Sequence, residues 1–137
     1  MLNLKKVLVS LDGFVDNQYL DKYVQLVERN ARTPMRRGLT NRHHIIPKVW
    51  FTLNGKEVDN NPSNLVTLNY REHNLAHYYL CLCTKGKLLY ANELALECLK
   101  SRKKLGEQNR QLIEGLPLYN IIYKDYMSKK KKNYRLY

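Results

Sequence analysis

The sequence predicts an α+β fold, and three observations lead to it. Apolar residues recur at helical spacing between about 16 and 31, two short segments rich in aliphatic residues follow at 39–47 and 65–68, and helical periodicity returns after residue 70. A length of 137 residues suits one domain with a modest core. The order of helix, two strands and further helices therefore favours a single α+β domain over residues 1–137.

The first expected helix runs from about residue 16 to residue 31. Asp16 is a suitable N-cap, because a carboxylate can accept the free N–H groups of a first helical turn. The apolar stripe of this helix consists of Tyr19, Leu20, Tyr23, Val24 and Val27. Thr33 and Pro34 end the helix, and a basic connector that contains Arg36 and Arg37 follows.

The two expected strands are separated by a polar loop. Residues 39–47 form an Ile-rich first strand that ends at Pro47, and the segment LNGKEVDNNPSN (53–64) is rich in turn-forming residues. The short segment LVTL (65–68) has the composition of a second strand.

Helical periodicity returns at residue 70. Asn69 followed by Glu72 resembles a capping box and predicts a helix over 70–83. Gly86 separates it from a helix over about 88–104, and Pro117 is expected in the first turn of a last helix. Residues 87–137 are thus a basic helical region.

Charge and cysteine content restrict the function classes. The chain carries 24 Lys and Arg against 12 Asp and Glu, a net charge of +12, which favours a polyanionic partner such as nucleic acid. No apolar run is long enough to span a bilayer and no secretory signal is recognised, so no membrane role is expected. Cys81, Cys83 and Cys98 are expected to be reduced core thiols of a cytoplasmic protein.

The four histidines of the chain form two pairs. His73 and His77 are four residues apart on an expected helix, so both rings leave the same face and can reach one divalent ion. His43 and His44 are neighbours on an expected strand and point to opposite sides. One of them can then bind the ion while the other acts as a free base, and adjacency alone does not tell which.

Three motifs occur in the order RHHIIP (42–47), NPSNLVTL (61–68) and REHNLAH (71–77). Together they resemble the HNH family of nucleases, most closely small HNH endonucleases of phages and mobile elements. The resemblance covers about a third of the chain. It implies a ββα-metal core over about 39–84, preceded by the N-terminal helix and followed by the C-terminal helices.

The resemblance also implies a role for each motif residue. His43, His73 and His77 would hold one divalent metal ion (Mg, Mn, Ni or Zn), His44 would be the general base, and Asn64 would hold the loop that aims it. Hydrolysis of a phosphodiester would leave 5′-phosphate and 3′-hydroxyl ends. The protein would act in the cytoplasm of a bacterial host or a phage-infected cell. The exchange of His43 and His44 stays open.

Basic residues supply the expected contacts with nucleic acid. Arg42 and Arg71 flank the histidine motifs, and basic clusters lie at 32–37, 100–104 and 129–132. The residues expected to bind phosphates are Arg42, Arg71, Arg36, Arg37, Lys103, Lys104, Lys130 and Lys131. DNA is the expected partner and RNA an alternative, for a monomer or a homodimer. The competing function is a nucleic-acid-binding or inhibitory protein that keeps the scaffold without cleavage.

Overall fold

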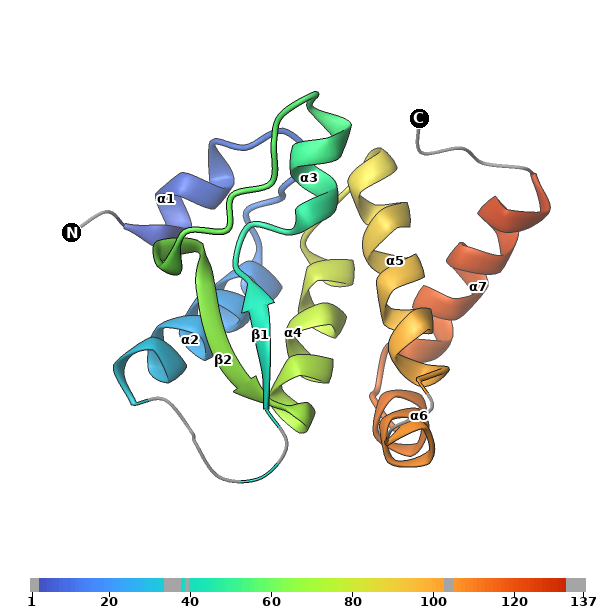
Figure 1. The fold of residues 1–137 in the computed structure, drawn as a ribbon. Helices are drawn as coiled ribbons and strands as arrows, with labels where there is room; N and C mark the ends of the chain where they lie inside the picture. The colour runs from blue at the N-terminus through green and yellow to red at the C-terminus, as the bar shows by residue number, and fades with distance from the viewer. Residues whose placement is uncertain (1–2, 34–37, 39, 103–104, 133–137) are drawn as a thin grey trace.

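In a computed structural model, which describes residues 3–33, 38, 40–102 and 105–132, helices surround a two-stranded antiparallel sheet (Figure 1). The α+β class predicted from the sequence is confirmed. The elements are α1 (Leu4–Val9), α2 (Gln18–Arg32), β1 (Thr40–His44), α3 (Lys48–Leu53), a 3₁₀ turn (Pro62–Asn64), β2 (Leu65–Asn69), α4 (Tyr70–Leu82), α5 (Gly86–Lys100), α6 (Gly106–Glu114) and α7 (Tyr119–Lys131).

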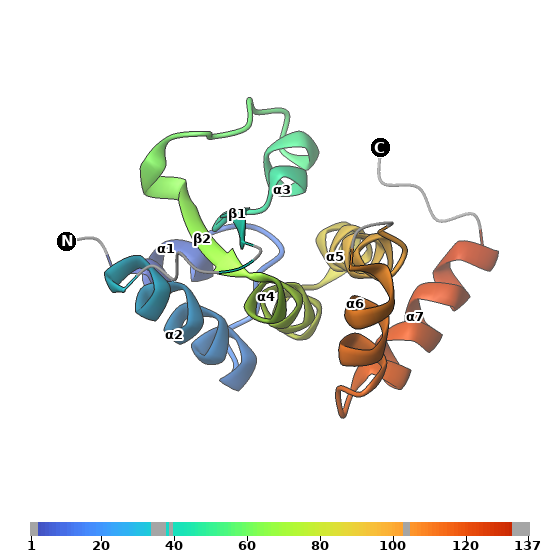
Figure 2. The same ribbon diagram turned by 60° about the horizontal axis from the view of Figure 1, so that its bottom comes forward.

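The sheet and its covering helices place the first histidine pair. β1 pairs with β2 so that His43 lies opposite Val66 and His44 opposite Leu65. Helices α2 and α4 pack against each other and against the strands, and both lie on one side of the sheet (Figure 2). The side chains that face these helices are buried, which includes Val66, Leu68 and His43. The inward face of β1 therefore ends in an imidazole.

Helix α2 begins at Gln18, and its N-cap is Asn17 rather than the expected Asp16. The Asn17 side chain accepts the N–H groups of Tyr19 and Leu20, and its amide donates to the carbonyl of Leu82 at the end of α4. Asp16 forms an ion pair with Lys5 on α1 instead. An amide can cap a helix and donate to a second helix at once, which an ionised carboxylate cannot do.

Helix α4 begins at the expected residue. Asn69 is the N-cap, and its Oδ1 accepts the N–H of Glu72 at 2.8 Å. The Glu72 carboxylate accepts hydrogen bonds from Arg29 and Asn30 on α2, at 2.7 and 2.9 Å. The start of α4, just before His73, is thereby fixed to α2.

After α5, the chain forms two helices where one was expected. The helix expected over 88–104 is α5, which ends at Lys100, and the last region folds as α6 and α7. Pro117 lies in the turn before α7 and not in its first turn, which is a correction. Helices α1, α3 and α6 were not expected. They have six to nine residues, too few for a clear period, and each buries apolar side chains such as Leu8, Phe51 and Ile113.

One cysteine differs from expectation. Cys81 and Cys83 are buried as expected, whereas Cys98 is an exposed thiol. Helix α5 buries Leu96 and Leu99, while the edge with Ala95 and Cys98 lines a cleft. Helix α5 packs against α4, α6 and α7, and the edge with Ala95 and Cys98 does not take part in the apolar core of the described residues.

Two apolar clusters share α4. The sheet cluster joins α2, the strands and α3 and includes Tyr23, Trp50 and Leu68. The helical cluster joins α4 to the C-terminal helices and includes Leu96, Ile113 and Ile122. None of the helices in the described part of the chain has the length and apolar character needed to cross a membrane.

Candidate metal centre and the adjoining cleft

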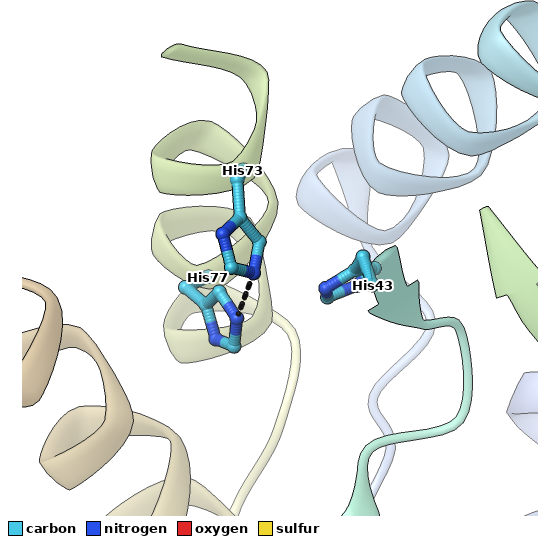
Figure 3. A group of neighbouring side chains, drawn as sticks. All are labelled: His43, His73 and His77. Atoms are coloured by element: carbon cyan, nitrogen blue, oxygen red, sulfur yellow. Dashed lines mark hydrogen bonds between the residues drawn. The ribbon is translucent and has the colours of Figure 1, made fainter. Parts of the chain in front are cut away.

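Three histidines from two separate elements meet at one point (Figure 3). His43 comes from β1, and His73 and His77 come from successive turns of α4. Each offers a ring nitrogen, and these nitrogens all lie within 4.8 Å of one another. The Nε2 atoms of His73 and His77 are 3.1 Å apart. Two nitrogens on one tetrahedral ion, at bonds of about 2.0–2.1 Å, would be about 3.3–3.4 Å apart, so the pair fits a shared cation closely.

The protonation of this cluster also suits a metal ion. Burial lowers the pKa of His43 well below its usual value, and the nearby rings of His77, His73 and His44 lower it further. Burial lowers the pKa of His73 to about 4, with a contribution from the positive charge of Arg102. Burial, His73 and Arg102 lower the pKa of His77 to about 3. All three rings are therefore neutral at pH 7, and neutral imidazole is the form that binds metals.

The second nitrogens of these rings have different surroundings. His43 Nε2 lies 2.7 Å from the hydroxyl of Tyr23 on α2. His77 Nδ1 is buried and has no hydrogen-bond partner among the described residues. Packing and its Nε2 contact therefore hold the His77 ring, whereas a hydrogen bond to Tyr23 holds His43 through Nε2.

His44 occupies the other side of β1. It is half-buried, and its Nε2–H donates to Oδ1 of Asn60 at 2.8 Å. A neutral imidazole that donates through Nε2 keeps its lone pair on Nδ1. Asn60 was not expected at the site. It lies in a polar loop in which asparagines are ordinary turn residues, and the sequence carries no signal that distinguishes it.

Asn64 makes the side-chain-to-backbone hydrogen bonds expected of it. Its Oδ1 accepts the N–H of Ile46 at 2.8 Å, and its Nδ2 donates to the carbonyls of Ile46 and Asp59. Its own carbonyl accepts the N–H of Ile45 at 2.9 Å. Asn64 thus joins the segment after His44 to the loop before β2. Its part in catalysis stays a prediction.

A cleft of about 320 Å³ opens beside the histidines. Its lining residues are Arg42, His43, His44, Pro47, Lys48, Val49, His73, His77, Asn92, Ala95, Cys98, Leu99 and Arg102. This described lining contains three basic side chains and no carboxylate. Arg42, Lys48 and Arg102 have no ion-pair partner among the described residues, whereas Arg29, Lys100 and Arg110 elsewhere are paired with Glu72, Glu97 and Glu107. Such a cleft favours an anionic ligand.

The residues expected to bind nucleic acid are only partly at this cleft. Arg42 lines it. Arg71 is exposed outside the lining, where its guanidinium lies 5.8 Å from the centre of the Tyr70 ring. Lys130 and Lys131 lie in the last turn of α7, a helix that packs on α5, and are also outside the lining. Arg36, Arg37, Lys103 and Lys104 fall outside the described residues.

Arg102 was expected only as one member of a basic cluster. It follows the end of α5, reaches the cleft and lowers the pKa of His73 and His77.

Comparison of the chain with protein-family models, with curated proteins and with solved structures found no match. Its chemistry must be inferred from these residues: three neutral imidazoles can hold a divalent cation at the wall of a basic cleft.

Proposed function

We propose that the protein is a metal-dependent DNA endonuclease of the HNH type, in which β1, β2 and α4 form the ββα-metal unit. One observation carries the proposal. His43, His73 and His77 gather their ring nitrogens within 4.8 Å, and His44 lines the same cleft with a partner of its own. Three ligands and a separate base suit single-metal hydrolysis of a phosphodiester.

The three clustered histidines would hold the cation. They are neutral donors, so the ion keeps its full positive charge towards the cleft, and nitrogen ligands suit Zn, Ni, Co or Mn. When bound, the cation would stabilise the negative charge that develops on a phosphoryl oxygen and on the leaving 3′ oxygen. Magnesium stays an alternative, because related sites work with it.

His44 would accept a proton from the attacking water. Its Nε2–H is held by Asn60, which leaves the Nδ1 lone pair for this proton. Attack in line with the 3′ oxygen would give 5′-phosphate and 3′-hydroxyl ends. A positioned general base contributes about 10²–10⁴-fold to the rate of such reactions.

Basic side chains would hold the substrate against the site. Arg42 and Lys48 lie on the β1–α3 side of the cleft, and Arg102 reaches it from the end of α5. Guanidinium groups bind phosphate oxygens through paired hydrogen bonds, and the +12 charge of the chain would attract the DNA backbone.

A nicking assay tests the proposal. Supercoiled plasmid is incubated with the wild-type protein in Mg, Mn, Ni or Zn, beside EDTA and beside the variants His44→Ala and His73→Ala. The variants, purified in the same way, are the matched controls for contaminating nuclease. We expect metal-dependent nicking in the wild type, a loss of at least a hundredfold in His44→Ala with metal binding retained, and loss of both in His73→Ala.

Other outcomes of this assay contradict the proposal. DNA binding without nicking in every metal would favour the competing function, a nucleic-acid-binding or inhibitory protein. Cleavage of RNA but not of DNA would change the substrate class. Nicking that survives in His44→Ala would remove His44 from the role of base.

A further inference from the structure

We propose that Tyr23 on α2, outside the strands and helix that carry the histidines, is a positioning residue for the metal centre. It would fix the His43 tautomer that presents Nδ1 to the cation and hold the backbone that follows His44. This inference deepens the proposed function and rests on the metal site assumed there. Its basis is the hydrogen bonding of one buried hydroxyl group.

The Tyr23 hydroxyl has two partners and only one proton. Its oxygen lies 2.7 Å from the carbonyl oxygen of Ile45 and 2.7 Å from Nε2 of His43. A carbonyl oxygen can only accept, so the hydroxyl proton must point to Ile45. The hydroxyl oxygen is then an acceptor towards His43, and Nε2 must carry a hydrogen. The neutral His43 ring therefore keeps its lone pair on Nδ1.

The burial of Tyr23 makes this arrangement fixed. Its side chain is fully buried in the sheet cluster, where its hydroxyl donates to the carbonyl of Ile45. A buried carbonyl or imidazole N–H without a hydrogen-bond partner costs free energy. Tyr23, His43 and the Ile45 carbonyl therefore hold one another in place.

Tyr23 also acts on the segment after His44. It binds the Ile45 carbonyl from the α2 side, while the Asn64 carbonyl accepts the Ile45 N–H from the β2 side. The same peptide segment is thus held from two directions. Hydrogen bonds to the outer nitrogen of a metal-binding imidazole orient the ring, and their removal typically weakens metal binding by 10–100-fold.

The variant Tyr23→Phe tests this inference, and Tyr78→Phe is the matched control. Tyr78 is also a buried tyrosine whose hydroxyl binds a backbone group, the N–H of Leu118. It belongs to the helical cluster and not to the histidine site. Binding of Zn²⁺ and Ni²⁺ is measured by calorimetry, with circular dichroism to verify folding. We expect 10–100-fold weaker binding in Tyr23→Phe and wild-type binding in Tyr78→Phe.

A second measurement does not depend on any variant. Long-range ¹H–¹⁵N NMR spectra of the metal-free wild-type protein report which nitrogen of His43 is protonated. We expect the Nε2–H tautomer. An Nδ1–H tautomer, or unchanged metal affinity in folded Tyr23→Phe, would overturn the inference.

These measurements use no DNA, so failure of the endonuclease proposal can be distinguished from failure of the inference about Tyr23. Absence of nicking, with metal binding that still depends on Tyr23, overturns the endonuclease proposal and leaves this inference standing. A wild-type protein that binds none of Zn²⁺, Ni²⁺, Mn²⁺ and Mg²⁺ overturns both.

Discussion

At the scale of residues, the neighbours His43 and His44 both line the cleft but have different partners. His43 is buried and meets Tyr23, His73 and His77, whereas His44 is half-buried and meets Asn60. The alternation of side chains along a strand produces this division. Under the proposed function it separates the ligand from the base, and it favours His43 as the ligand.

The contact between His44 and Asn60 can be tested by substitution. Asn60→Leu removes the acceptor for the His44 N–H, so the ring loses its orientation, and we expect kcat for nicking to fall by about tenfold or more. Metal affinity should not change, because Asn60 does not contact the clustered histidines. Asn60→Asp keeps an acceptor oxygen and should restore most of the rate. An Asn60→Leu protein with the wild-type rate would exclude this role.

Residues of the candidate site differ in how well the sequence predicts them. The spacing of His73 and His77 on a helix predicts that they share an ion, whereas His43 is added to them only because the resemblance to the HNH family implies it. The structure brings the three together. Tyr23 and Asn60 were not expected at the site. Their contacts bridge 20 and 16 residues and arise only when α2 and the loop before β2 fold against β1.

At the scale of elements, α5 and α7 enclose an acid that the site does not use. The carboxylate of Glu93 is buried between the helices, 3.1 Å from Nζ of Lys129, which also pairs with Asp125 at 2.7 Å. Burial and a hydrogen bond with Asp125 raise the pKa of Glu93 to about 8. The folded protein therefore binds this proton more tightly than the unfolded chain does.

This acid gives stability a defined pH dependence. The stabilisation from a protonated Glu93 is complete below the unfolded pKa, near 4.5, and is lost as pH rises through about 8. We expect the free energy of unfolding to fall by an amount on the order of a few kcal/mol across that window. Urea denaturation at several pH values measures it.

The matched variants for this experiment are Glu93→Gln and Glu107→Gln. Glu93→Gln stays neutral at every pH, so it should flatten the profile and be more stable than the wild type above pH 8. Glu107 is exposed on α6 and paired with Arg110, so its replacement should leave the slope unchanged. A wild-type slope retained in Glu93→Gln would assign the pH dependence to another group.

The boundaries of helices were predicted best where an N-cap residue precedes a long segment with helical periodicity. The start of α4 was correct because Asn69 caps it, whereas α3 and α6 were missed. A helix of six residues such as α3 has little stability of its own and forms because Trp50 and Phe51 enter the sheet cluster. That burial depends on the whole fold, so the six residues of α3 carry no sequence pattern that predicts the helix.

At the scale of the whole molecule, the basic side chains differ in whether an acidic residue forms an ion pair with them. Arg42, Lys48 and Arg102 lie together at the cleft and have no ion-pair partners in the described part of the chain, whereas Lys5, Arg29 and Arg110 are paired with acidic residues. Composition predicts the net charge, but only the fold brings residues 42, 48 and 102 together. Under the proposed function, these three residues should release counterions when DNA binds.

The salt dependence of DNA binding tests this distribution. Anisotropy of labelled duplex DNA is measured with His44→Ala protein in EDTA over a range of KCl concentrations. We expect Arg42→Gln and Arg102→Gln each to reduce the slope of log K against log[salt] by about 0.9. Arg110→Gln removes a paired guanidinium outside the cleft and should leave the slope unchanged. Equal effects of all three variants would contradict a binding surface centred on the cleft.

The two walls of the cleft belong to different parts of the core. The three clustered histidines lie on β1 and α4, whereas Ala95, Cys98 and Arg102 lie on or beside α5. Sequence changes in the packing between α5 and α4 would therefore widen or narrow the entrance and leave the spacing of the imidazoles intact. Such changes would alter the size of the ligand that the cleft admits without moving the three histidines relative to one another.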